Sequence, residues 1–325
     1  MTTLEFDDFR LHRRRNFRPL TARTCLLSYD PCGEKGKATP PIAGPSAPPA
    51  KPRRSVAVLG FKNLSERQGS KYLSIALSEM FTTELAAGEN LRTIPGENVA
   101  QMKINLALSD AGSFSRETLA QIRRNLSADL VVLGSYLATG DQASGMIRLD
   151  LRVQDAAQGE TIASVAETGT RTKLFNLVSE AGAQLREKLG VGKLSSAQGD
   201  ILLASFPKDP DAARLYSEGL AKLRLFDALG ARDLLEKAIV ADPNFPLSHS
   251  ALAAAWSILG YDGKARVEAE RAFALSASLS REDRLSAEGM YRESTREWEK
   301  AIEVYRGLWD FFPDNLEYGL RLAAA

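Results

Sequence analysis

Residues 219–243 read GLAKLRLFDALGARDLLEKAIVADP, and the small residues in this stretch decide the fold of the C-terminal third of the chain. Gly219, Ala231, Ala238 and Pro243 are separated by 12, 7 and 5 residues, and the same spacing recurs twice further along. The later positions are Ala253, Ala265, Ala272 and Ala277, then Gly289, Ala301, Leu308 and Pro313. Small residues are needed where two helices cross closely, because a larger side chain would push the helices apart. The pattern therefore predicts repeated helix pairs, offset by 34 and then 36 residues.

Residues 210–325 resemble the tetratricopeptide family, in which each repeat of about 34 residues forms two helices. The matching positions are Leu215, Gly219, Ala231, Leu235, Ala238 and Pro243 in the first repeat, Ala253, Trp256, Ala265, Ala269 and Ala272 in the second, and Leu285, Gly289, Ala301, Tyr305 and Pro313 in the third. Ala277 replaces the closing proline, and two extra residues precede the third repeat. Asp209 and Ser280 are expected to cap helices at their N-termini.

A fourth repeat starts at Leu316, but the sequence stops at Ala325, near the end of that repeat's first helix. Repeat arrays need a terminal helix with a polar outer face to cover the last apolar seam. We therefore expect either that the sequence is a fragment or that residues 316–325 pack only loosely.

The resemblance implies that an extended or helical peptide binds the concave face, which is lined by the first helix of each pair. The groove candidates are Tyr216, Leu220, Leu223, Arg224, Ser250, Ala254, Ser257, Ser286, Met290 and Glu293. Members of the family that clamp a chain-terminal carboxylate place Lys and Asn at such positions. Because the candidates here are mostly apolar or hydroxylic, capture of a C-terminus is not expected. Trp256 is expected to pack between helices.

The segment 55–192 has alternating strand and helix signals. Val56–Leu59 and Leu130–Leu133 are short apolar runs, typical of strands buried on both faces. Apolar residues at helical spacing lie between them, at 73–85 and 119–126. Residues 147–153 alternate apolar and charged side chains, which indicates a half-exposed antiparallel strand. A returning strand at 161–167 and an amphipathic helix at 174–189 complete one mixed α/β domain.

This domain resembles the TolB amino-terminal-like and FlgO-like domains of bacterial proteins over about residues 55–190. The resemblance rests on four stretches, SVAVLGFKNLS (55–65), LSEMFTTEL (77–85), DLVVLGS (129–135) and DAAQGE (155–160). Such domains often precede tetratricopeptide arrays in the C-terminal, sensory half of bacterial receptor serine/threonine kinases. The kinase domain and the membrane helix of those proteins have no counterpart in this sequence.

Composition excludes several classes of protein. The chain has 325 residues and a net charge of +1, so there is no overall field to hold nucleic acid. No apolar stretch reaches the ~20 residues of a transmembrane helix. Residues 1–54 contain eight of the 14 prolines and an excess of basic residues, which predicts a disordered tail and linker. The predicted division is therefore 1–54 tail and linker, 55–192 α/β domain, 193–209 linker, and 210–325 repeats.

The sequence offers no catalytic, cofactor-binding or metal-binding set. Two Cys, Cys25 and Cys32, and two His, His12 and His249, are too few and too scattered for a structural zinc site or a disulfide framework. The stretch GVGKL at 190–194 is not a phosphate loop, because Leu194 stands where a Mg²⁺-binding Ser or Thr is needed. We therefore expect no enzyme activity and no cofactor.

The sequence as a whole predicts an α+β multidomain protein, with a mixed α/β sandwich-like domain followed by an all-α tetratricopeptide array. The predicted function is a non-catalytic interaction or sensory module, with a scaffold or signalling role, that binds a protein or peptide partner through the tetratricopeptide groove. Two alternatives remain open at this point. The chain could be the severed sensor half of a kinase, which would be extracytoplasmic, or an envelope-associated accessory protein acting through the α/β domain. As given, the sequence predicts a cytoplasmic protein.

Overall fold

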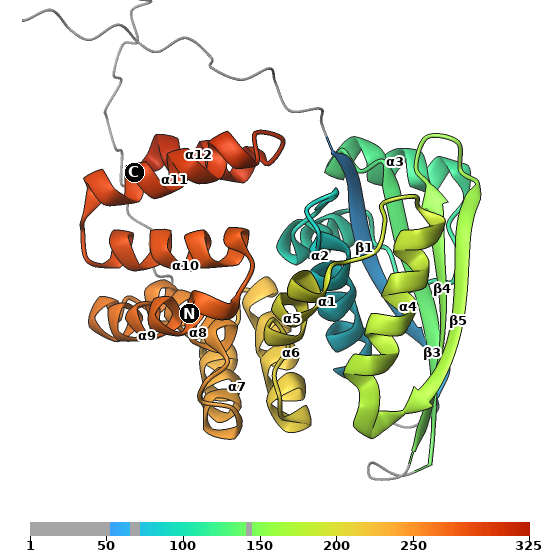
Figure 1. Ribbon diagram of the computed structural model, residues 1–325, viewed down its shortest axis with the longest axis horizontal. Helices are drawn as coiled ribbons and strands as arrows, with labels where there is room; N and C mark the ends of the chain where they lie inside the picture. Colours follow the sequence, from blue (N-terminus) through green and yellow to red (C-terminus); the bar gives the residue numbers. More distant parts are fainter. Residues whose placement is uncertain (1–52, 66–71, 141–144) are drawn as a thin grey trace, which may run out of the picture. The chain divides into compact units, whose positions relative to one another are not determined.

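The computed structural model describes residues 53–65, 72–140 and 145–325. The tail and linker predicted for residues 1–54, with both cysteines and His12, therefore lie almost entirely outside the described residues. All described residues belong to one compact unit of the chain, Pro49–Ala325. Within it, a five-stranded sheet with flanking helices is followed by a helical array (Figure 1). This confirms the predicted fold class.

The sheet has the order β2-β1-β3-β4-β5 and is mixed. Strands β1 (Arg54–Asn63), β2 (Leu91–Thr93) and β3 (Leu130–Thr139) run parallel, whereas β4 (Met146–Asp155) and β5 (Thr161–Thr170) continue it as antiparallel strands. Seven successive residues of β1, from Ser55 to Phe61, are buried, as expected for a strand covered on both faces. In β4 buried and exposed residues alternate over most of the strand.

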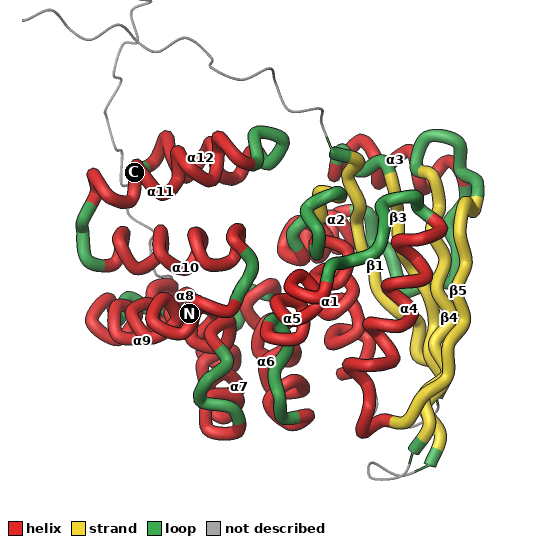
Figure 2. Tube along the Cα trace, viewed as in Figure 1, coloured by secondary structure: helices red, strands yellow, loops and turns green. Residues whose placement is uncertain are grey.

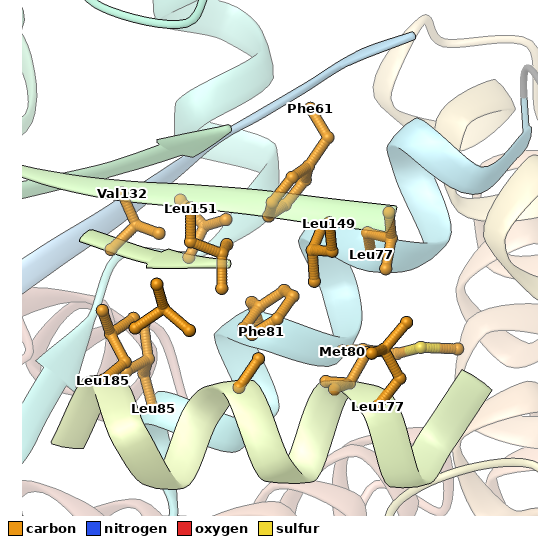
Figure 3. Packing of buried hydrophobic residues seen from close by; sticks show 14 of the residues in the cluster. Phe61, Leu77, Met80, Phe81, Leu85, Val132, Leu149, Leu151, Leu177 and Leu185 are labelled. Atoms are coloured by element: carbon orange, nitrogen blue, oxygen red, sulfur yellow. The ribbon is translucent and has the colours of Figure 1, made fainter. Parts of the chain in front are cut away.

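Helices cover both faces of the sheet. One apolar core lies between the sheet and helices α1 (Tyr72–Ala86) and α4 (Leu174–Lys188). Figure 3 shows Phe81 of α1 and Leu177 of α4 pointing toward Leu149 and Leu151 of β4. A second core lies on the other face, against α2 (Gly96–Asn105) and α3 (Arg116–Leu126). The α/β portion is thus a three-layer sandwich.

The C-terminal array consists of helix pairs joined by short loops (Figure 2). The helices are α6 (Pro210–Arg224), α7 (Ala228–Ala241), α8 (Pro246–Ile258), α9 (Asp262–Leu275), α10 (Arg281–Ser294), α11 (Trp298–Phe311) and α12 (Leu316–Ala324). A Cβ at Gly219 would lie 2.8 Å from Cγ of Leu235, and one at Gly289 would lie 2.6 Å from the ring of Tyr305. The repeated small residues therefore stand where paired helices touch.

Helix starts and the inserted residues agree with the sequence pattern. The Asp209 side chain accepts hydrogen bonds from the backbone N–H groups of Asp211 and Ala212, and Ser280 accepts one from Asp283. The two extra residues before the third repeat are taken up by a short 3₁₀ helix, η3 (Ser276–Ser278), at the position where Ala277 replaces proline.

Two segments differ from simple expectation. Residues 193–209 contain helix α5 (Ser196–Ala204), which begins with a capping box between Ser195 and Gln198. Leu202 and Phe206 are buried in the core beside α4, so most of this expected linker is folded.

In α12 Tyr318 is buried against Phe312, whereas Leu316 and Leu320 are exposed. The last helix thus packs against the preceding pair through the buried Tyr318 and the partly buried Leu322, while its other face is exposed.

None of the helices in the described ranges combines the length and the apolar character needed to cross a bilayer.

Candidate functional site

A cavity of about 990 Å³ lies between the second and third helix pairs, and we refer to it as the repeat cavity. Helix α8 contributes Ala254 and Ser257, and α10 contributes Met290 and Glu293. Four of the groove candidates therefore line one cavity. Further lining residues come from α9, from the turn between α10 and α11, from the first residue of α11, and from α12. They include Asp262, Arg266, Ala269, Arg296, Trp298 and Arg321.

The wall of the repeat cavity combines exposed apolar side chains with free cations. Ile258 is 60% exposed and Trp298 is 45% exposed. No ion pair joins Arg266 or Arg296 to a carboxylate in the part of the chain that the structure describes. Arg321 differs, because it lies 3.2 Å from Glu317 and 3.8 Å from Glu293. The cavity can thus offer apolar contact and two uncommitted guanidinium groups.

The candidates on α6 have other neighbours. The ring of Tyr216 packs edge-on against Phe245 at 5.2 Å between centroids and borders a small cavity against α1. Burial raises the pKa of Tyr216 above its usual value. Leu220 and Leu223 pack against the core of the first two helix pairs, which also contains the buried Trp256. Ser250 and Ser286 are half-buried on α8 and α10.

Arg224, the last groove candidate, joins α6 to the α/β portion. Its guanidinium donates to the carboxylate of Glu79 on α1 at 2.7 Å and lies 3.4 Å from that of Glu97 on α2. The side chain is only 10% exposed. Burial by itself would lower the pKa of Arg224, but the carboxylate of Glu79 raises it above the usual value. The structure therefore places Arg224 at a contact between elements more than a hundred residues apart in sequence.

Replacing Arg224 by alanine should destabilise the chain, because Glu79 and Glu97 would lose their shared cation at a half-buried site. We expect the free energy of unfolding to fall by about 2 kcal/mol in urea titrations. Arg266→Ala is the matched control, since Arg266 has no ion-pair partner among the described residues. Equal losses of stability in the two variants would contradict the structural role of Arg224.

Comparison with known proteins identifies fold similarities only. No family model and no curated protein matches the chain. Among solved structures, the first TPR domain of Spaghetti (RPAP3) bound to an HSP90 peptide is 24% identical, with 36% of this chain and 93% of that chain covered and a TM-score of 0.31. The LpoB C-terminal domain from Salmonella enterica is 18% identical, with 38% and 87% covered and a TM-score of 0.30.

TolB from Acinetobacter baumannii is 9% identical over 43% of this chain and 28% of that chain, with a TM-score of 0.27. A relation to receptor kinases, which the sequence resemblance also raised, finds no support in these comparisons. Each of these three likenesses covers less than half of the chain.

Proposed function

We propose that this chain is a non-catalytic interaction module that holds a segment of a partner protein in the repeat cavity. The observation that carries the proposal is the composition of the cavity wall, with Trp298, Ile258 and Met290 beside Arg266 and Arg296, which have no ion-pair partner among the described residues. Tryptophan and arginine are enriched among the residues that dominate binding energy at protein interfaces. A volume of about 990 Å³ is ample for the side chains of a short peptide segment.

The two kinds of wall group suggest how a segment would be held. An apolar side chain of the partner would displace water from Met290 and Trp298, and its burial would supply most of the affinity. Backbone carbonyls or acidic side chains beside it would accept hydrogen bonds from Arg266 and Arg296, which fix orientation. Tyr216, Leu220, Leu223 and Arg224 would then support the array rather than contact the partner, because their neighbours belong to this chain.

The proposal is tested with peptides selected on the full chain from a random library displayed on phage. Met290→Asp places a charge in the apolar part of the cavity and should weaken the selected peptides at least about tenfold. Val240→Asp is the matched control, because Val240 is 84% exposed on α7 and does not line the cavity. Circular dichroism verifies that both variants are folded. Peptides that bind all three proteins equally would contradict the proposal.

A further inference from the structure

A second cavity, of about 520 Å³, lies beside strand β1 between α1, α2 and the end of α6, and we refer to it as the edge cavity. It exists because β2 is short. Strand β2 pairs only with Arg54–Val56, so within the described residues the remainder of β1 has no strand neighbour on that side. Val58, Leu59 and Gly60 line the cavity where a longer strand would have continued the sheet.

This edge of β1 is closed by side chains rather than by a strand. Nζ of Lys103 donates to the carbonyl of Leu59 at 2.9 Å and to Asp110 at 2.5 Å. Oγ of Ser74 donates to the carbonyl of Phe61 at 2.7 Å and lies 3.0 Å from Asp110. The carbonyls of Leu59 and Phe61 already accept hydrogen bonds from these side chains. A peptide strand that entered the cavity could therefore not pair with them as it would with the edge of a sheet. A compact molecule is the better occupant.

Glycine is required at position 60 for this arrangement. Gly60 has a φ of +126°, and a Cβ there would lie 2.8 Å from Oδ1 of Asp110. Only a residue without a side chain lets the pair of Lys103 and Asp110 come this close to the strand in that backbone conformation. The floor of the edge cavity is therefore held in place before any molecule enters.

The wall formed by α1 offers hydrogen-bond acceptors. The hydroxyls of Ser78 and Thr82 donate to the backbone carbonyls of Ser74 and Ser78, at 2.8 Å each. A hydroxyl has one proton, so only lone pairs remain for a ligand. Glu79 uses one carboxylate oxygen for Arg224, and its other oxygen has no hydrogen bond among the described residues. The polar groups left free on this wall therefore accept hydrogen bonds and do not donate them.

The other walls of the edge cavity carry apolar side chains, or cationic side chains whose charge is already paired with a carboxylate. Val99 and Ile104 of α2, Leu108 and Leu225 supply the apolar surface. The two cations that line the cavity, Lys103 and Arg224, are each bound to carboxylates of this chain. An anionic ligand would therefore have to compete with Asp110 and Glu79, whereas a ligand with N–H groups finds acceptors that no donor of the described residues occupies.

We propose that the edge cavity binds a small amphipathic molecule whose apolar body lies against α2 and whose amine or amide N–H groups donate to Ser78, Thr82 and Glu79 on α1. The cavity volume lies within the range of small-molecule sites. Leu225 and Arg224 also line it, so a bound molecule contacts α6 as well as the sheet portion. The site is separate from the repeat cavity.

Three six-carbon probes with different end groups test the chemistry: hexylamine, hexanamide and hexanoate. The backbone amides of Gly60 and Gly96, which line the cavity, serve as reporters in heteronuclear NMR spectra of the full chain. Hexylamine and hexanamide should give saturable shifts with a Kd on the order of 1 mM, whereas hexanoate should give none. Binding of hexanoate as tight as that of hexylamine, or the absence of saturable shifts with all three probes, would overturn the proposal.

Single substitutions test whether the probes bind in the edge cavity. Ala100→Phe fills it and should abolish the shifts. Thr82→Val keeps the shape of the side chain but removes an acceptor, and should weaken hexanamide roughly fivefold even if Ala100→Phe fails to fold. Ser257→Ala in the repeat cavity is the control and should bind as the parent does. Unchanged affinity for hexanamide in Thr82→Val would refute the assignment to the α1 wall.

Discussion

Glu84→Leu should lower the free energy of unfolding near neutral pH by about 3–5 kcal/mol, because it leaves the charge of Arg186 buried without its partner. The side chain of Glu84 on α1 is 0% exposed and that of Arg186 on α4 is 5% exposed. Nη1 of Arg186 donates to the carboxylate of Glu84 and, at 3.0 Å, to its backbone carbonyl. Equilibrium unfolding in urea, with the slope checked for two-state behaviour, measures the loss.

The double variant Glu84→Leu/Arg186→Met should recover most of that loss. Removing two charges from water is costly, and a buried ion pair repays the cost only when all its polar groups are satisfied. Nε of Arg186 has no hydrogen-bond partner within the described residues, so the pair falls short of that condition. Asp150→Leu breaks the exposed pair with Arg148 and should change stability little. A double variant as unstable as Glu84→Leu would contradict this account.

The repeats and the principal strands could be predicted from sequence because their signals are local and periodic. Gly219 and Gly289 recur at a fixed spacing, and the apolar runs of β1 and β3 are continuous. By contrast, β2 is three residues long and α2 buries only Val99 and Met102, so neither has enough periodicity to be recognised. Their positions depend on contacts with distant parts of the chain.

The candidate site was predictable only in part, for the same reason. Ser257, Met290 and Glu293 lie on helix faces that the repeat pattern defines, and all three line the repeat cavity. Arg224 satisfies the same pattern, yet it is paired with Glu79, 145 residues earlier in the chain. Trp298 was missed because an aromatic residue at a helix start resembles an ordinary packing residue. Its 45% exposure beside a cavity is evident only in three dimensions.

Glu84 shows how strongly burial can change the chemistry of a residue that looks ordinary in sequence. It lies in helix α1 after Thr82 and Thr83, and a glutamate in a helix usually faces solvent. In the structure a Cβ at Gly182 would overlap Cγ of Glu84, so α4 approaches α1 closely enough to enclose the carboxyl group. Burial raises the pKa of Glu84 from 4.5 to about 7, although the nearby charge of Arg186 opposes the shift.

Stability should therefore fall as the pH rises through this range. Between pH 4.5 and about 7 the folded chain retains the proton on Glu84 while the unfolded chain has lost it. Since the folded state then binds more protons, its free energy advantage decreases with increasing pH. The decrease from this residue alone amounts to about 3 kcal/mol, is complete near the raised pKa, and is absent below the unfolded value.

Glu84→Gln isolates that contribution from the other carboxyl groups. Glutamine keeps an oxygen that accepts a hydrogen bond from Arg186, but its side chain does not titrate. Burial also raises the pKa values of Glu282 and Asp283. These groups titrate in both proteins, so their contribution cancels in the difference in unfolding free energy between parent and variant. We expect the parent to lose stability relative to Glu84→Gln as the pH rises from 4.5 to 7. If the unfolding free energies of parent and variant changed with pH in parallel, Glu84 would have the same pKa in the folded and the unfolded chain. An opposite slope would mean that the attraction of Arg186 exceeds the desolvation of the carboxylate, and the buried pair would then be a source of stability rather than a cost.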